Sequence, residues 1–268
     1  MKKILTITWA LTLALALAGC AGKSASWSFV LDRTFDTDDY TARNGTVLAA
    51  CDYELPRLVL RSDDAAPGEQ PPEAVATVRD AFNAEMEHQR ALLAEEYYEL
   101  EQLAIADWSE RSAEERERFT PTGNCIEIVE TRQTPRLLSV RAAGYSNWGG
   151  AYPWGLARAW NFDLKTGAFV TWKDLTDQPD ALCTALADEV KRQARERGLD
   201  RGFFDGWEAD VEQFEGCSVY FGADTLTVVF DDQLLGPHAA GMPEFAIDCD
   251  GVSRYFNNYG KELLKKEG

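Results

Sequence analysis

The chain has 268 residues and a formal net charge of −18 at pH 7, with 45 Asp and Glu against 27 Lys and Arg. Phosphate backbones would repel such an acidic chain, so we exclude nucleic acid as a partner, and the surface suits basic partners or simply keeps the protein in solution. The length allows one large domain or two small ones, and eight Trp residues supply bulk for a packed core.

The first twenty residues resemble a bacterial export signal that ends in a lipobox. Lys2 and Lys3 precede an uncharged, Leu- and Ala-rich stretch from Ile4 to Ala18, which is too short to span a bilayer comfortably. The stretch runs into LAGC, in which small residues admit a signal peptidase and the thiol of Cys20 can carry lipid. We expect a signal peptide over residues 1–19 and a lipidated Cys20 with a tether over residues 20–28. The alternative is an ordinary cleaved signal in which Cys20 is incidental.

This reading makes the protein extracytoplasmic and held to a bacterial membrane through the lipid anchor only. No later segment has an apolar run of spanning length. In the following chain, alternating or β-rich segments predict strands over residues 28–36 and 46–61. A loop over residues 63–72 leads into a helix that begins at Glu73 and keeps a period near 3.6 as far as Ala104.

The rest of the chain shows further strand and helix patterns, and nothing in it repeats internally. Strands are expected over residues 125–130, 137–146, 157–164 and 168–172, and again over 217–221, 225–230 and 244–248. A second helix is expected over residues 179–197, stopped by Gly198. This order predicts an α+β fold of two closely packed units, each an antiparallel sheet with a helix on one face, with domains over residues 29–135 and 136–268.

The five cysteines after Cys20 can oxidise outside the cytoplasm. We expect two disulfides, Cys51 with Cys125 and Cys183 with Cys217, because these pairs keep each bridge within one half of the chain. Five free thiols are the alternative. With no CxxC pair and only two histidines, we expect neither a zinc site nor any cofactor.

Between Glu73 and Arg118, thirteen Asp or Glu stand against five Arg. Charges at helical spacing most often form a solvated face, and the alternative is a docking surface for a cationic protein. The pairs Asp231-Asp232 and Asp248-Asp250 have oxygen ligands that suit Ca²⁺, but the spacing of an EF-hand is absent.

An aromatic cluster in a Gly-rich loop is the more informative signal for function. Trp and Tyr combine a large apolar body with a polar tip, which favours them at the centres of binding sites and in stacking against sugar rings. The candidate binding residues are Tyr145, Trp148, Tyr152, Trp154 and His238. The alternative is that the rings pack in the core. No Ser or Cys adjoins His238, so we assign no catalytic residue.

The stretch from Leu138 to about Tyr259 resembles the extracytoplasmic domain of RsiV-type proteins, which are lysozyme-responsive anti-sigma factors. Four pieces carry the resemblance, namely SVRAAGYSNWGGAYP, NFDLKTGAFVTWKDL, TLTVVFDDQLLGPHAAG and EFAIDCD. The region from Phe29 to about Glu130 more faintly resembles the companion domain upstream in the same family and in some peptidoglycan deacetylases. This chain lacks the sigma-binding segment, the membrane helix and the deacetylase domain, so the resemblance implies binding only.

Two motifs depart from the pattern expected for the family. The chain has Tyr152 in GGAYP and His238 in GPHAAG, where we expect GGAHP and GPYAAG. This exchange would preserve a contact between one tyrosine and one histidine, so we predict that the rings of Tyr152 and His238 touch.

These observations predict a non-enzymatic, surface-anchored binding or sensor-like module. The resemblance implies lysozyme or another basic wall-active protein as a ligand, and cell-wall material is the other candidate. One alternative is an accessory or catalytic envelope protein that acts on peptidoglycan, which requires a His or converging carboxylates in a cleft. Another is a purely structural envelope protein, which requires that Trp148, Tyr152 and Trp154 are all buried.

Overall fold

The computed structural model describes residues 25–150 and 152–265. The predicted signal peptide, Cys20 and the start of the tether lie outside these residues. No helix in the described ranges is long and apolar enough to cross a membrane.

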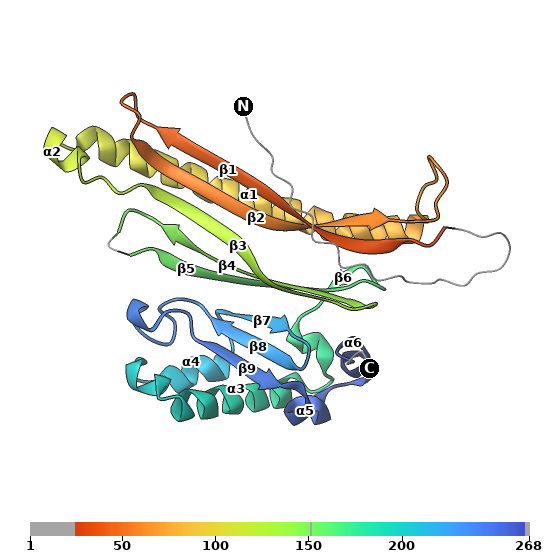
Figure 1. Ribbon diagram of the computed structural model, residues 1–268. Helices are drawn as coiled ribbons and strands as arrows, with labels where there is room; N and C mark the ends of the chain where they lie inside the picture. Colours follow the sequence, from red (N-terminus) through yellow and green to blue (C-terminus); the bar gives the residue numbers. More distant parts are fainter. Residues whose placement is uncertain (1–24, 151, 266–268) are drawn as a thin grey trace.

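The fold is α+β, as predicted, and contains two sheets and two long helices (Figure 1). The strands are β1 (Ser28–Thr41), β2 (Val47–Arg61), β3 (Thr122–Gln133), β4 (Leu137–Asn147), β5 (Trp154–Asp163), β6 (Ala168–Phe169), β7 (Cys217–Phe221), β8 (Thr225–Phe230) and β9 (Glu244–Asp248). The α-helices are α1 (Glu73–Glu110), α2 (Ala113–Arg116), α3 (Pro179–Glu196), α4 (Trp207–Gln213), α5 (Cys249–Val252) and α6 (Asn258–Leu263). Short 3₁₀ helices are η1 (Trp172–Leu175), η2 (Leu199–Gly202), η3 (His238–Ala240) and η4 (Ser253–Tyr255).

The first sheet has six strands in the order β1 to β6. Neighbouring strands are antiparallel except β2 and β3, which are parallel because α1 carries the chain back along the sheet between them. The prediction of purely antiparallel sheets is therefore wrong for this unit. The predicted boundary at residues 135 and 136 falls between β3 and β4, which pair over their whole length. Strands from both predicted domains thus share one sheet.

The helix α1 covers one face of this sheet. Its buried side chains Val78, Phe82, Met86, Tyr97 and Ala104 join strand residues in one core cluster. Where β3 no longer pairs with β2, Asn83 of α1 hydrogen-bonds the backbone N–H and C=O of Leu58 at 2.8 and 2.9 Å. The helix therefore satisfies strand backbone groups as well as burying apolar surface.

A charged side chain, that of Glu54, also satisfies a strand backbone group and links β1, β2 and β3. Glu54 on β2 accepts a hydrogen bond from the backbone N–H of Ile128 at 2.8 Å and from the guanidinium of Arg33 at 2.9 Å. The Glu54 side chain is only 10% exposed. It supplies an acceptor just beyond Tyr53 and Ile126, the last residues at which β2 and β3 pair.

The second sheet, in the order β7-β8-β9, packs against the other face of the first sheet at β4 and β5. Asn161 on β5 donates to the carbonyl of Val219 at 2.8 Å, and Ser139 on β4 accepts from the N–H of Phe221 at 3.1 Å. The helices α3 and α4 cover the outer face of the second sheet (Figure 1). The layers are therefore helix, sheet, sheet and helix, and within the described residues the second sheet lies against β4 and β5 rather than β1 and β2.

Candidate functional site

The hairpin tip, residues 145–154 between β4 and β5, carries four large aromatic side chains at the surface. Tyr145, Trp148, Tyr152 and Trp154 are 46%, 41%, 68% and 50% exposed. Core packing is therefore not the role of Trp148, Tyr152 and Trp154. Exposed rings of this size on a strand connection are a feature of binding surfaces rather than of cores.

The rings of Tyr152 and His238 stack, as predicted. Their centroids lie 5.1 Å apart with an interplanar angle of 26°. The contact joins the hairpin tip to the β8–β9 loop, residues 231–243, although the two residues are far apart in the sequence. The exchange of Tyr and His between the two motifs is therefore compatible with one preserved ring contact.

The carboxyl group of Asp232 holds His238 in the position in which its ring stacks on Tyr152. Its Oδ2 lies 2.7 Å from His238 Nδ1 and accepts the backbone N–H of Gly155 at 3.1 Å. The Asp232 side chain is only 2% exposed, and His238 is 36% exposed. Nδ1 of His238 is therefore engaged by the Asp232 carboxyl group, and Nε2 is the ring nitrogen that Asp232 does not occupy. One carboxylate oxygen thereby holds β5 and the β8–β9 loop together.

Gly155 permits this close approach of the β8–β9 loop. A Cβ at that position would lie 3.0 Å from Cγ and Sδ of Met242. The loop therefore rests directly on the backbone of β5 at the base of the hairpin tip. A larger residue at position 155 would force Met242 aside.

The five predicted binding residues do not form one continuous surface. Ser146 pairs with Trp154 and points towards α1, since its hydroxyl donates to Glu96 of that helix at 2.6 Å. Successive side chains on a strand point to opposite faces, so Tyr145 lies on the face that carries the second sheet and Trp154 on the α1 face. Tyr152 and His238 form the contacting pair, and the other rings surround the hairpin tip on both faces.

The sequence did not single out Asp232 as the residue that organises the site. The sequence pattern indicates only an acidic pair, Asp231-Asp232, with oxygen ligands of the kind that suit Ca²⁺. Among the described residues, no group of three or more His, Cys, Asp or Glu is placed to hold a metal ion. Burial raises the pKa of the neighbouring Asp231, against the opposing effect of Arg158. The available signal was the position of Asp232 two residues after a buried strand and six before His238.

The two predicted disulfides are not formed in the structure, where Cys51, Cys125, Cys183, Cys217 and Cys249 are free thiols. In the parallel register Cys51 lies beside Asn124, so Cys125, one residue on, points to the opposite face of the sheet. Cys183 and Cys217 instead donate to the carbonyls of Glu212 and Phe214 at 3.7 and 3.6 Å. Burial raises the pKa of the Cys217 thiol to about 12.

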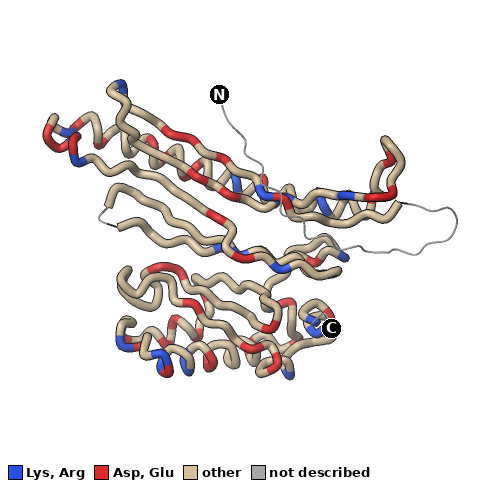
Figure 2. The backbone as a smooth tube through the Cα atoms, in the orientation of Figure 1, with Lys and Arg blue, Asp and Glu red and all other residues tan. Residues whose placement is uncertain are grey.

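Acidic side chains are spread over the whole molecule rather than gathered at the hairpin tip (Figure 2). Acidic residues occur along α1, along α3 and in the loops next to the second sheet (Figure 2). Several of those on α3 pair with Lys191 or Arg192. The charge of the chain thus supplies a general attraction for cations, while the shape of a contact would be set by the aromatic rings.

Two solved structures are similar to this chain. A member of the DUF3298 family from Bacteroides fragilis NCTC 9343 is 14% identical, with a TM-score of 0.61, and the match covers 90% of this chain and 99% of that chain. A DUF3298 family protein from Pseudomonas aeruginosa PAO1 is 12% identical, with a TM-score of 0.48 and coverage of 85% and 94%.

No family model and no curated protein matches the sequence. At this identity the first likeness establishes the fold alone, over both sheets of the chain. Neither neighbour is described as an RsiV-type protein, so that resemblance stays a prediction.

Proposed function

We propose that this protein is a lipid-anchored, extracytoplasmic binding module without enzymatic activity, and that its ligand is a basic wall-active protein such as lysozyme. The observation that carries the proposal is the hairpin tip, where four aromatic side chains are exposed on a base fixed by Asp232 and His238. The identity of the ligand rests on the predicted RsiV-type resemblance. The membrane location rests on the LAGC motif at Cys20.

The physical chemistry supports a contact of this kind. Interfaces are enriched in Trp and Tyr, and truncation of a central aromatic residue commonly costs about 2 kcal/mol or more, which is about 30-fold in affinity. A net charge of −18 would speed the encounter with a cationic protein at low salt. Because the ring of Tyr152 is stacked on His238, less side-chain entropy is lost when it binds.

The test is a titration of the full chain with hen egg lysozyme at low and moderate salt, monitored by calorimetry. We expect saturable binding that weakens as salt increases, and a Trp148→Ala/Tyr152→Ala variant that binds about 30-fold more weakly or worse. Tyr98→Ala is the matched control, because Tyr98 is 61% exposed but lies on α1. Absence of binding at both salt concentrations, or equal loss in the control, would refute the proposal.

A second candidate is an accessory or catalytic protein that acts on peptidoglycan. The observation in its favour is the hydrogen bond between the buried Asp232 and His238, since a buried carboxylate orients the imidazole in many general bases. Soluble fragments released from purified peptidoglycan by the wild-type chain, and not by His238→Ala, would support this candidate over the first.

A further inference from the structure

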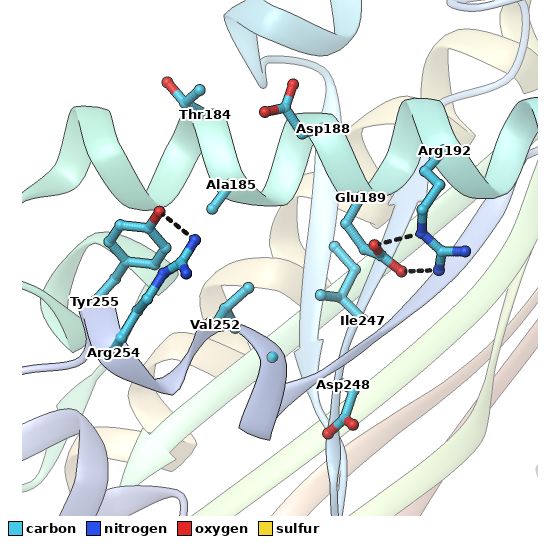
Figure 3. A pocket seen from close by; sticks show the side chains of 11 residues that line it. Thr184, Ala185, Asp188, Glu189, Arg192, Ile247, Asp248, Val252, Arg254 and Tyr255 are labelled. Carbon is cyan, nitrogen blue, oxygen red and sulfur yellow. Dashed lines mark hydrogen bonds and ion pairs between the residues drawn. The ribbon is translucent and has the colours of Figure 1, made fainter.

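A cavity of about 370 Å³ opens between α3 and the segment from β9 to η4 (Figure 3). It shares no residue with the hairpin tip. Cavities that hold small ligands have volumes of about 300–1,000 Å³, so this one suits a ligand of modest size. Ile247 and Val252 are 1% and 5% exposed and, with Ala185 of α3, give the cavity an apolar floor.

Most charged groups around the cavity already have partners within the protein. Arg192 forms an ion pair with Glu189, and its Nε–H donates to that carboxylate at 2.8 Å. Asp188 lies 3.4 Å from Lys191, and Asp248 accepts the backbone N–H of Asp250 at the start of α5. Asp188, Glu189 and Arg192 therefore hold little unpaired charge for a ligand, whereas Asp248 is capped by a backbone N–H alone.

Arg254 is different, because it forms no ion pair within the part of the chain that the structure describes. Its guanidinium lies 4.8 Å from the centroid of the Tyr255 ring, and Nη2 donates to the Tyr255 hydroxyl at 2.9 Å. The phenol therefore holds the guanidinium at one end of the cavity, beside Ala185 (Figure 3). Both side chains belong to η4 and line the cavity.

This arrangement has the donors that a carboxylate needs. The Tyr255 hydroxyl accepts from Arg254, so its own hydrogen is free to be donated, and the planar guanidinium has further N–H groups. An arginine fork matches both oxygens of a carboxylate. Of the three carboxylates that line the cavity, Asp188 and Glu189 are paired with Lys191 and Arg192. Asp248 lies away from Arg254 (Figure 3), so the guanidinium is the nearest charge to a ligand held at this end. At 0.1 M salt, charges beyond about 10 Å are largely screened.

We propose that this cavity binds a small organic carboxylate with a hydrocarbon body. The carboxylate would accept from Arg254 and Tyr255, and the hydrocarbon would lie on Ala185, Ile247 and Val252. An organic cation would meet the guanidinium with the wrong charge, and acetate would leave the apolar floor uncovered. The inference is independent of the proposed lysozyme contact, because none of its residues lies at the hairpin tip.

The test uses the full chain with hexanoate as the probe, followed by NMR of the methyl groups. We expect saturable shifts of the Ala185 and Val252 methyl signals, while that of Ala142, which is buried in β4, stays unchanged. Hexylamine should produce no such shifts, and acetate only weaker ones. No saturable shift with hexanoate, or equal shifts with hexylamine, would overturn the proposal.

Variants separate the two parts of the cavity. Arg254→Gln should weaken hexanoate binding about tenfold, because a charge-assisted pair is lost, and Arg201→Gln on η2, which is also exposed, should leave it unchanged. Ala185→Leu should abolish binding by filling the floor without removing any donor. Unchanged binding in both Arg254→Gln and Ala185→Leu would show that hexanoate binds elsewhere.

Discussion

Phe82→Ala tests whether α1 ties the two halves of the chain into one folding unit. Phe82 lies on α1 and is fully buried, with its ring centroid 5.3 Å from that of Phe162 on β5 and 5.8 Å from that of Phe169 on β6. Removing a buried Phe side chain costs about 3–5 kcal/mol through lost transfer energy and the cavity left behind. The variant also loses both aromatic contacts, so we expect the free energy of unfolding to fall by about 4 kcal/mol.

Urea denaturation followed by circular dichroism measures this cost. With a slope of about 2–3 kcal/mol per M, a loss of 4 kcal/mol lowers the midpoint by about 1.5–2 M. We also expect a single transition, because β1–β3 and β4–β6 form one sheet. Leu92→Ala is the control, since Leu92 is on the same helix but 47% exposed, and its cost should stay below about 1 kcal/mol. A loss below about 1.5 kcal/mol for Phe82→Ala, or two separate transitions in the wild type, would refute the reasoning.

Three further predictions concern single positions. Glu54→Ala should lower the free energy of unfolding by about 1–3 kcal/mol and speed hydrogen exchange at the Ile128 amide, because that amide loses its acceptor. Gly144→Ala should prevent native pairing of β3 and β4, since a Cβ there would lie 1.8 Å from a backbone oxygen. Burial raises the pKa of Cys217 and Cys249 from about 9 to about 12, so their contribution to stability is full below pH 9 and is lost as the pH rises towards 12. Thermal unfolding should therefore show a loss of about 1 kcal/mol per thiol by pH 10.

Each of these has a matched comparison. Glu127→Ala on the exposed side of β3 should leave exchange at Ile128 unchanged, and equal exchange in both variants would count against the role of Glu54. Gly150→Ala, where a Cβ meets nothing closer than 3.9 Å, should fold normally while Gly144→Ala does not. A Cys217→Ala/Cys249→Ala variant should lose less stability between pH 9 and 11 than the wild type; an identical slope would contradict the assignment to these thiols.

Local patterns predicted the regular elements well. The 3.6-residue period predicted the start of α1 at Glu73, and the stop at Gly198 predicted the end of α3 to within one residue. The strand patterns predicted β7, β8 and β9 with their observed bounds. The short helix α4 was missed, because its seven residues, which follow Gly206 with φ +87°, are too few to show a period. Only the beginning of the strand expected over residues 168–172 forms, as β6, and the chain then turns into η1.

The pairing of the strands could not be predicted, because it depends on contacts between distant segments. Alternation along β2 and β3 indicates two strands but not that they run parallel with Cys51 beside Asn124. The proposed Cys51 to Cys125 bridge failed for this reason. At the hairpin tip, the motif exchange did predict the contact of Tyr152 with His238, whereas Asp232 gained its role only through the fold.

The pairing of β3 with β4 across the predicted boundary limits how the chain can be divided. A fragment ending at residue 135 would lack β4, one of the two strands that pair with β3. The edge of β3, which is twelve residues long, would then present unpaired N–H and C=O groups to solvent. Such an edge is a template for association between copies. Separate expression of the two predicted domains should therefore yield aggregates, and any protease or fusion site is better placed in the loop between β2 and α1.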